Sequence, residues 1–248
     1  MPISFWRRQR RKTIKTSYLA GSSRVNCGVK DRMQNITIVG FGNSITAAKV
    51  SLPDETKRWP NILKRKLSET FKDREFNVVN SGVGGNSTRE AMARYERDVL
   101  AHNPDYVILE FGGNNNDENK PERRVSFDEF IELLCKYKRG LNPKTRTITV
   151  TFPPVYENRT RAEQYPSCAS YLELFNKRQD RLQHFRELSK KFALDNGWPV
   201  YDLYAELGRL SKSGGWEKYT LPDCVHLTEA GNSVLAEGVF QILKEMLR

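Results

Sequence analysis

The sequence has few residues that bind metals or form disulfides. Its 248 residues include three histidines and four cysteines, and the cysteines form no C-x-x-C pair and show no regular spacing. This pattern argues against a zinc knuckle or a disulfide framework. We therefore expect no metal site, and any imidazole that acts as a general base must be one of three.

Long apolar runs are also absent. No stretch approaches the roughly 18 consecutive apolar residues of a membrane-spanning helix, and the first residues lack the apolar core of a secretory signal. We therefore expect a cytoplasmic protein without a membrane span. The phosphate-binding motif G-x-x-x-x-G-K-[ST] is missing, and Gly40-Phe41-Gly42 lacks the third glycine of a dinucleotide fingerprint, so we expect no cofactor.

The positive charge is concentrated at one end of the chain. Of the formal net charge of +11, residues 1–35 contribute +8, with nine basic side chains against Asp31. The remaining residues carry only +3, which is ordinary for a protein surface, so we do not expect a nucleic-acid partner. We predict a basic, poorly ordered extension over 1–35 and one folded domain over 36–248.

From residue 36 onward, short apolar runs alternate with longer amphipathic stretches. This pattern is typical of a parallel sheet covered by helices on both faces. We expect strands at 36–41, 76–80, 105–111, 146–152 and 198–202, and helices that include 171–196 and 228–247. The polar segments 114–126 and 153–170 follow strands, so they are the expected walls of a ligand site.

The sequence contains one candidate nucleophile, a candidate base and a carboxylate that can orient the base. Ser44 follows the first expected strand and Gly42, near a helix N-terminus that can stabilise an oxyanion. His184 lies in a charged helix, and His102 precedes a strand at the wrong end of the sheet, which leaves His226 as the base. Asp223, three residues earlier, can orient the imidazole. The pattern is also compatible with Ser44 as a helix cap and His226 as a surface histidine.

Four separated segments resemble the motifs of the SGNH/GDSL hydrolase family, in the family's order. They are GNSIT at 42–46, NSGVGGNST at 80–88, GGNN at 112–115 and DCVH at 223–226. The resemblance implies a three-layer α/β/α fold with a flavodoxin-like five-stranded parallel sheet. It implies a catalytic triad of Ser44, Asp223 and His226, and an oxyanion hole made by Ser44, Gly85 and Asn114.

The family resemblance has two departures and leaves the substrate open. The family's usual aspartates are Asn43 and Asn115 here, and each exchange removes a negative charge. The implied function is a serine esterase, and the polar segment 153–170 favours a short acyl group on a carbohydrate-like carrier. The alternatives are a lysophospholipase or thioesterase of the same family, and a binding protein with an impaired triad. The sequence does not indicate an oligomeric state.

Overall fold

The computed structural model describes residues 33–49, 52–116, 120–154 and 179–248. Within them, five strands form one parallel sheet in the order β2-β1-β3-β4-β5. The strands are β1 Gln34–Gly42, β2 Arg74–Gly82, β3 Tyr106–Glu110, β4 Arg146–Val150 and β5 Val200–Tyr201. Because all pairs are parallel, the carboxyl ends of the strands share one edge of the sheet, where doubly wound folds bind their ligands.

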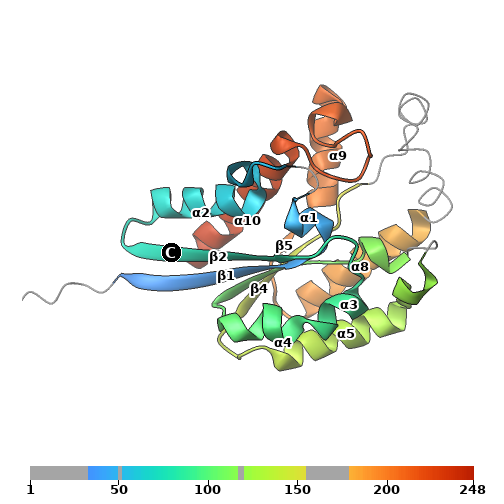
Figure 1. The fold of residues 1–248 in the computed structure, drawn as a ribbon, viewed down its shortest axis with the longest axis horizontal. Helices are drawn as coiled ribbons and strands as arrows, with labels where there is room; N and C mark the ends of the chain where they lie inside the picture. Colours follow the sequence, from blue (N-terminus) through green and yellow to red (C-terminus); the bar gives the residue numbers. More distant parts are fainter. Residues whose placement is uncertain (1–32, 50–51, 117–119, 155–178) are drawn as a thin grey trace, which may run out of the picture. The chain divides into compact units, whose positions relative to one another are not determined.

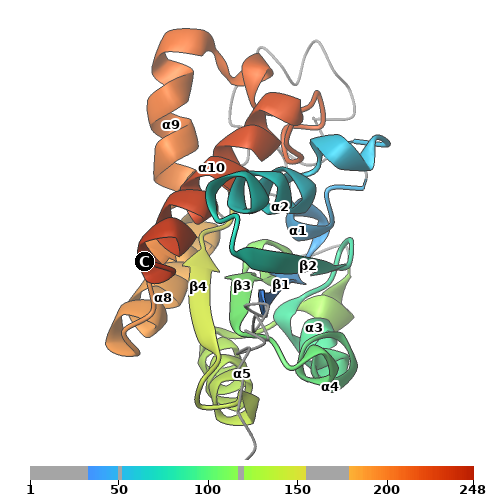
Figure 2. The same ribbon diagram turned by 90° about the vertical axis from the view of Figure 1, so that its left-hand side faces the viewer.

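Helices cover both faces of the sheet, which gives three layers (Figures 1 and 2). One face carries α1 Ser44–Ala47, α2 Trp59–Thr70, α9 Leu203–Gly214 and α10 Glu229–Met246. The other carries α3 Thr88–Ala93, α4 Tyr95–Asp98, α5 Phe127–Gly140 and α8 Gln179–Asp195. None of the described helices is long and apolar enough to cross a membrane.

Successive side chains of a central strand point to opposite faces of the sheet, so each strand contributes to two apolar clusters, one on each face. On β1, Ile36 and Ile38 belong to the apolar cluster under α2 and α10, whereas Val39 and Phe41 belong to the cluster under α4 and α5. All five residues of β3 are buried. A strand covered on both sides must be apolar on both sides, which explains the continuous apolar runs in the sequence.

The predicted α/β/α fold with a five-stranded parallel sheet is confirmed. The strand centres match the expected segments, although β1 begins at Gln34, two residues before the expected start, and β2 runs from Arg74 to Gly82. The prediction for 198–202 was too long, because the ladder of β5 with β4 contains only Val200 and Tyr201. Residues 1–32 of the predicted extension lie outside the described part of the chain.

The helix predictions were partly correct. The expected helix 228–247 is α10, with Thr228 as its N-cap: the Thr228 hydroxyl accepts from the Gly231 N–H at 3.2 Å. Of the expected helix 171–196, the described part is α8, and residues 171–178 lie outside the described residues. The sequence analysis did not identify α9, which begins after its N-cap Asp202.

Candidate active site

Ser44 is the first residue of α1, directly after β1 has ended. A side chain at Gly42 would collide with the Thr46 side chain and the Glu110 carbonyl, so only glycine allows this sharp exit from the strand. The Asn43 side chain caps the helix by accepting a hydrogen bond from the Ile45 N–H at 2.9 Å. Asn43 is fully buried, whereas Ser44 is partly exposed. The turn therefore presents the serine at the carboxyl edge of the sheet.

A buried carboxyl group lies beneath this turn. Glu110, at the end of β3, accepts hydrogen bonds from Asn43 Nδ2 at 3.2 Å and from Thr46 Oγ1 at 3.3 Å. Burial raises the pKa of Glu110 to about 7, although both of these hydrogen bonds oppose the rise. The sequence analysis missed Glu110; its one signal was a carboxylate inside an otherwise apolar strand.

The glycine segment that follows β2, residues 83–86, packs beside the turn that carries Ser44. Val83 donates its N–H to the Gly42 carbonyl at 3.1 Å, and a Cβ added to Gly84 would lie 4.0 Å from Ser44 Cβ. Gly85 has φ +76°, a left-handed conformation that favours glycine. The chain therefore brings Gly84, the neighbour of Gly85, close to the Ser44 side chain.

Asn114 and Asn115 join the third segment to the glycine segment. Asn114 donates from Nδ2 to the Asn86 carbonyl at 3.1 Å. Asn115 accepts from the Thr88 N–H at 2.9 Å and from the Thr88 hydroxyl at 3.0 Å. Its Nδ2 is buried and has no hydrogen-bond partner among the described residues. Asn115 therefore acts as an acceptor, the role that the family's aspartate can fill.

Arg94 ties these loops together and was also missed in the sequence. Its guanidinium donates to the Gly42 carbonyl at 2.8 Å, the Ser81 carbonyl at 2.7 Å and Asn86 Oδ1 at 2.7 Å. It also pairs with Asp98 at 2.9 Å, and its side chain is only 9% exposed. The Arg94 guanidinium thus holds together the end of β1, the end of β2 and the glycine segment.

Asp223 and His226 form a close pair in the loop before α10. Asp223 Oδ2 lies 2.6 Å from His226 Nδ1, while Oδ1 accepts from the His226 N–H at 2.9 Å and the Val225 N–H at 3.0 Å. Burial disfavours the charged carboxylate, but the hydrogen bonds from the imidazole and the two N–H groups outweigh it and lower the pKa of Asp223. The carboxylate therefore fixes the ring and directs Nε2 away from itself.

Contacts between α2, α10 and α1 connect the histidine loop to the serine turn. The Trp59 N–H donates to Asn232 Oδ1 on α10 at 3.2 Å, and the Trp59 indole donates to the Thr46 carbonyl at 3.0 Å. Lys57 pairs with Glu229 at 2.8 Å. No hydrogen bond joins Ser44 to His226 within the described chain. Catalytic hydrogen bonds are often long in ligand-free sites and tighten when substrate binds.

The remaining histidines lie elsewhere. His102 is exposed in a short 3-10 helix before β3, and His184 is exposed on α8 with its ring 4.3 Å from that of Phe127. Of the two predicted ligand walls, 114–126 is described except for 117–119, and 155–170 lies outside the described residues. Among the described residues there is no group of three His, Cys, Asp or Glu side chains that would hold a metal ion.

A hydroxyl beside a glycine loop and an imidazole oriented by a carboxylate are groups typical of hydrolases. The model of the GDSL-like lipase/acylhydrolase family matches residues 41–234, so the chain belongs to this family of carboxylic ester hydrolases. It is 34% identical over 131 residues to the uncharacterized lipoprotein YqeF of Bacillus subtilis, which covers 48% of this chain and 49% of that protein. The chain thus spans about half the length of YqeF.

Two further similarities extend over most of the chain. Esterase TesA of Pseudomonas aeruginosa is 24% identical over 211 residues, 85% of this chain and 89% of TesA. The crystal structure of an acetylxylan esterase from Geobacillus stearothermophilus superimposes with a TM-score of 0.64 at 22% identity, over 84% of this chain and 94% of that chain. At 22% identity, the similarity to the acetylxylan esterase structure shows a shared fold and no more.

Proposed function

We propose that the chain hydrolyses carboxylic esters through an acyl intermediate on Ser44. The observation that carries the proposal is the 2.6 Å contact between Asp223 and His226 in a loop tied through Trp59 to the serine turn. An oriented imidazole on the same side of the sheet as a partly exposed hydroxyl provides a base for a weak nucleophile.

In this mechanism His226 Nε2 removes the proton of Ser44 as its oxygen attacks the ester carbonyl. The negative oxygen of the tetrahedral intermediate accepts hydrogen bonds from the N–H groups of Ser44 and Gly85 and from Asn114 Nδ2. His226 then gives the proton to the leaving alcohol, and a water molecule activated by the same imidazole releases the acyl group. Asp223 stays ionised throughout and stabilises the imidazolium.

Labelling by a fluorophosphonate probe tests the nucleophile. The folded wild-type protein should be modified on Ser44, and Ser44→Ala should lose both labelling and hydrolysis of 4-nitrophenyl acetate. Ser68→Ala is the matched control, because Ser68 is exposed on α2. Folded wild-type protein that resists the probe would instead support the alternative of an impaired, ligand-binding member of the family.

Replacement of Asn114 tests the oxyanion hole. Asn114→Ala removes one donor, and the loss of one such donor costs about 3 to 4 kcal/mol of transition-state stabilisation. We expect kcat to fall by roughly 10² to 10³-fold, with a small change in KM. Full activity in this variant would exclude Asn114 from the oxyanion hole.

We further propose that the preferred substrates carry short acyl groups on carbohydrate-like alcohols. The polar composition of 153–170 and the shared fold with an acetylxylan esterase support this choice. A series of 4-nitrophenyl esters from acetate to palmitate, followed by acetylated xylo-oligosaccharides, tests it. Highest kcat/KM for the longest chains would favour a lysophospholipase or thioesterase instead.

A further inference from the structure

The guanidinium of Arg123 lies directly against Gly85. A Cβ added to Gly85 would be 2.8 Å from Arg123 Nη1 and 3.8 Å from Nη2. Gly85 is the residue to which we assign an oxyanion-binding N–H, and its neighbour Gly84 packs against Ser44. A permanent positive charge therefore lies beside the proposed site of reaction.

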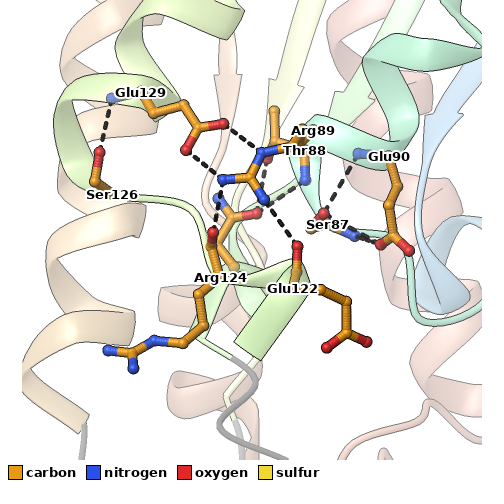
Figure 3. Close-up of polar contacts among 9 residues, drawn as sticks. Ser87, Thr88, Arg89, Glu90, Glu122, Arg124, Ser126 and Glu129 are labelled. Atoms are coloured by element: carbon orange, nitrogen blue, oxygen red, sulfur yellow. Dashed lines mark hydrogen bonds and ion pairs between the residues drawn. The ribbon is translucent and has the colours of Figure 1, made fainter. Parts of the chain in front are cut away.

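The backbone around Arg123 is held in place by a second arginine. Arg89 binds the Glu129 carboxylate through two contacts of 2.6 Å, and it donates to the carbonyls of Glu122 and Arg124 at 2.8 Å each (Figure 3). These two carbonyls stand on either side of Arg123 in the chain. The Val125 N–H adds a bond of 3.0 Å to the Asn115 carbonyl. The segment that carries Arg123 is therefore fixed to both α3 and α5.

The ion pair of Arg123 is made by Nε, so Nη1 and Nη2 remain directed at Gly85. Its one ion-pair partner among the described residues is Glu90, whose Oε1 lies 3.2 Å from Arg123 Nε. The other oxygen of Glu90 completes the capping box of α3 by accepting from the Ser87 N–H at 2.8 Å. The two side chains are 22% and 36% exposed, and ion pairs of this exposure stabilise a fold little.

We propose that Arg123 binds an anionic group of the substrate, such as a carboxylate or phosphate, next to the ester bond that is cleaved. A guanidinium presents paired N–H groups that match the two oxygens of such an anion. The bonds of Arg89 to the Glu122 and Arg124 carbonyls pre-order this segment and so reduce the entropy lost on binding. The inference rests on the proposed esterase activity and specifies its substrate class as acidic esters.

The anion can belong to either half of the substrate, and two matched pairs of esters distinguish these cases. Mono-(4-nitrophenyl) succinate against 4-nitrophenyl butyrate places the charge on the acyl group. 4-Acetoxybenzoate against its methyl ester places the charge on the alcohol. The quantity to measure is the ratio of kcat/KM for the charged ester to that for its neutral counterpart, because a loss of folding lowers both and leaves the ratio unchanged.

In at least one pair, the ratio should fall by about 10-fold in Arg123→Gln, the effect of losing one charge-assisted hydrogen bond. Arg123→Lys should retain part of the preference, and added salt should reduce the wild-type ratio. Arg124→Gln is the matched control, because its exposed side chain points away from the contacts of Arg89 (Figure 3). Equal ratios in wild type and Arg123→Gln, or an equal loss in Arg124→Gln, would overturn the proposal.

A binding measurement separates this proposal from the esterase proposal. In a Ser44→Ala background, calorimetry with both charged esters, mono-(4-nitrophenyl) succinate and 4-acetoxybenzoate, should show about 10-fold weaker binding of at least one of them when Arg123→Gln is added. If wild type hydrolyses the neutral esters but Arg123→Gln changes neither the ratio nor the binding, the anion site is refuted and the esterase proposal is not. If wild type hydrolyses neither member of any pair, the esterase proposal fails, and unaltered binding would then also refute the anion site.

Discussion

At the scale of single residues, the loop that carries the proposed catalytic residues Asp223 and His226 contains a strained position. Cys224 lies between Asp223 and His226 with φ +63°, and its side chain is fully buried. A residue with a Cβ pays about 1 to 2 kcal/mol for this left-handed conformation. The burial of its thiol also argues against a competing role of Cys224 as nucleophile, since a nucleophile must reach the substrate.

Two substitutions at this position separate strain from packing. Cys224→Ala removes the sulfur and keeps the Cβ, whereas Cys224→Gly removes both. Glycine relieves the strain at φ > 0 but increases the conformational entropy that the unfolded chain loses on folding. Because the first effect is larger, we expect Cys224→Gly to be more stable than Cys224→Ala by about 0.5 to 1 kcal/mol. Urea unfolding measures the difference, and fluorophosphonate labelling of both variants should persist. A more stable Cys224→Ala would show that the loop carries no such strain.

At the scale of elements, the candidate site is assembled from the ends of three strands and the loop before α10. Arg94 links two of these strand ends, those of β1 and β2, with the glycine segment. Arg94 touches no reacting atom in the proposed mechanism. It is a positioning residue for Asn86, whose carbonyl in turn accepts from Asn114.

Arg94→Lys tests this role, because lysine keeps the charge but cannot make the same set of bonds. We expect kcat to fall by about 10-fold or more while KM changes little, since the loss affects the geometry of the proposed oxyanion hole. Arg97→Lys is the matched control: Arg97 also pairs with Asp98, at 2.5 Å, but is 77% exposed. A parallel fall of kcat in both variants would assign the effect to Asp98 and not to the loops.

What the sequence predicted depends on the range of each interaction. The strands were recognisable because burial on both faces imposes continuous apolar runs, and the Asp223–His226 pair because it spans three residues. Glu110 and Arg94 were not, because they meet their partners Asn43 and Gly42 across 67 and 52 residues. The helix α9 was missed because Gly208 and its serines weaken the helical pattern, although Leu203 and Leu207 are fully buried.

At the scale of the whole molecule, two acidic residues of the candidate site, Asp223 and Glu110, make the free energy of unfolding depend on pH. The pKa of Asp223 is lowered in the folded protein, so its contribution is present above about pH 4 and is lost as the pH falls. Glu110 changes the stability with pH in the opposite direction. Its pKa rises from 4.5 to about 7 on folding, so the folded state binds more protons than the unfolded state between these values.

It follows that Glu110 makes the protein less stable as the pH rises from about 4.5 to about 7. This rise in pKa lowers the free energy of unfolding by about 3 kcal/mol above pH 7. Glu110→Gln is neutral at every pH, and its amide is able to accept from Asn43 and donate to the Thr46 hydroxyl. We expect this variant to be as stable as wild type near pH 4.5 and more stable near pH 8, measured by urea unfolding. If the stability difference between the two proteins is the same at both pH values, Glu110 does not take up a proton on folding, and its carboxyl group beneath the Ser44 turn is ionised throughout.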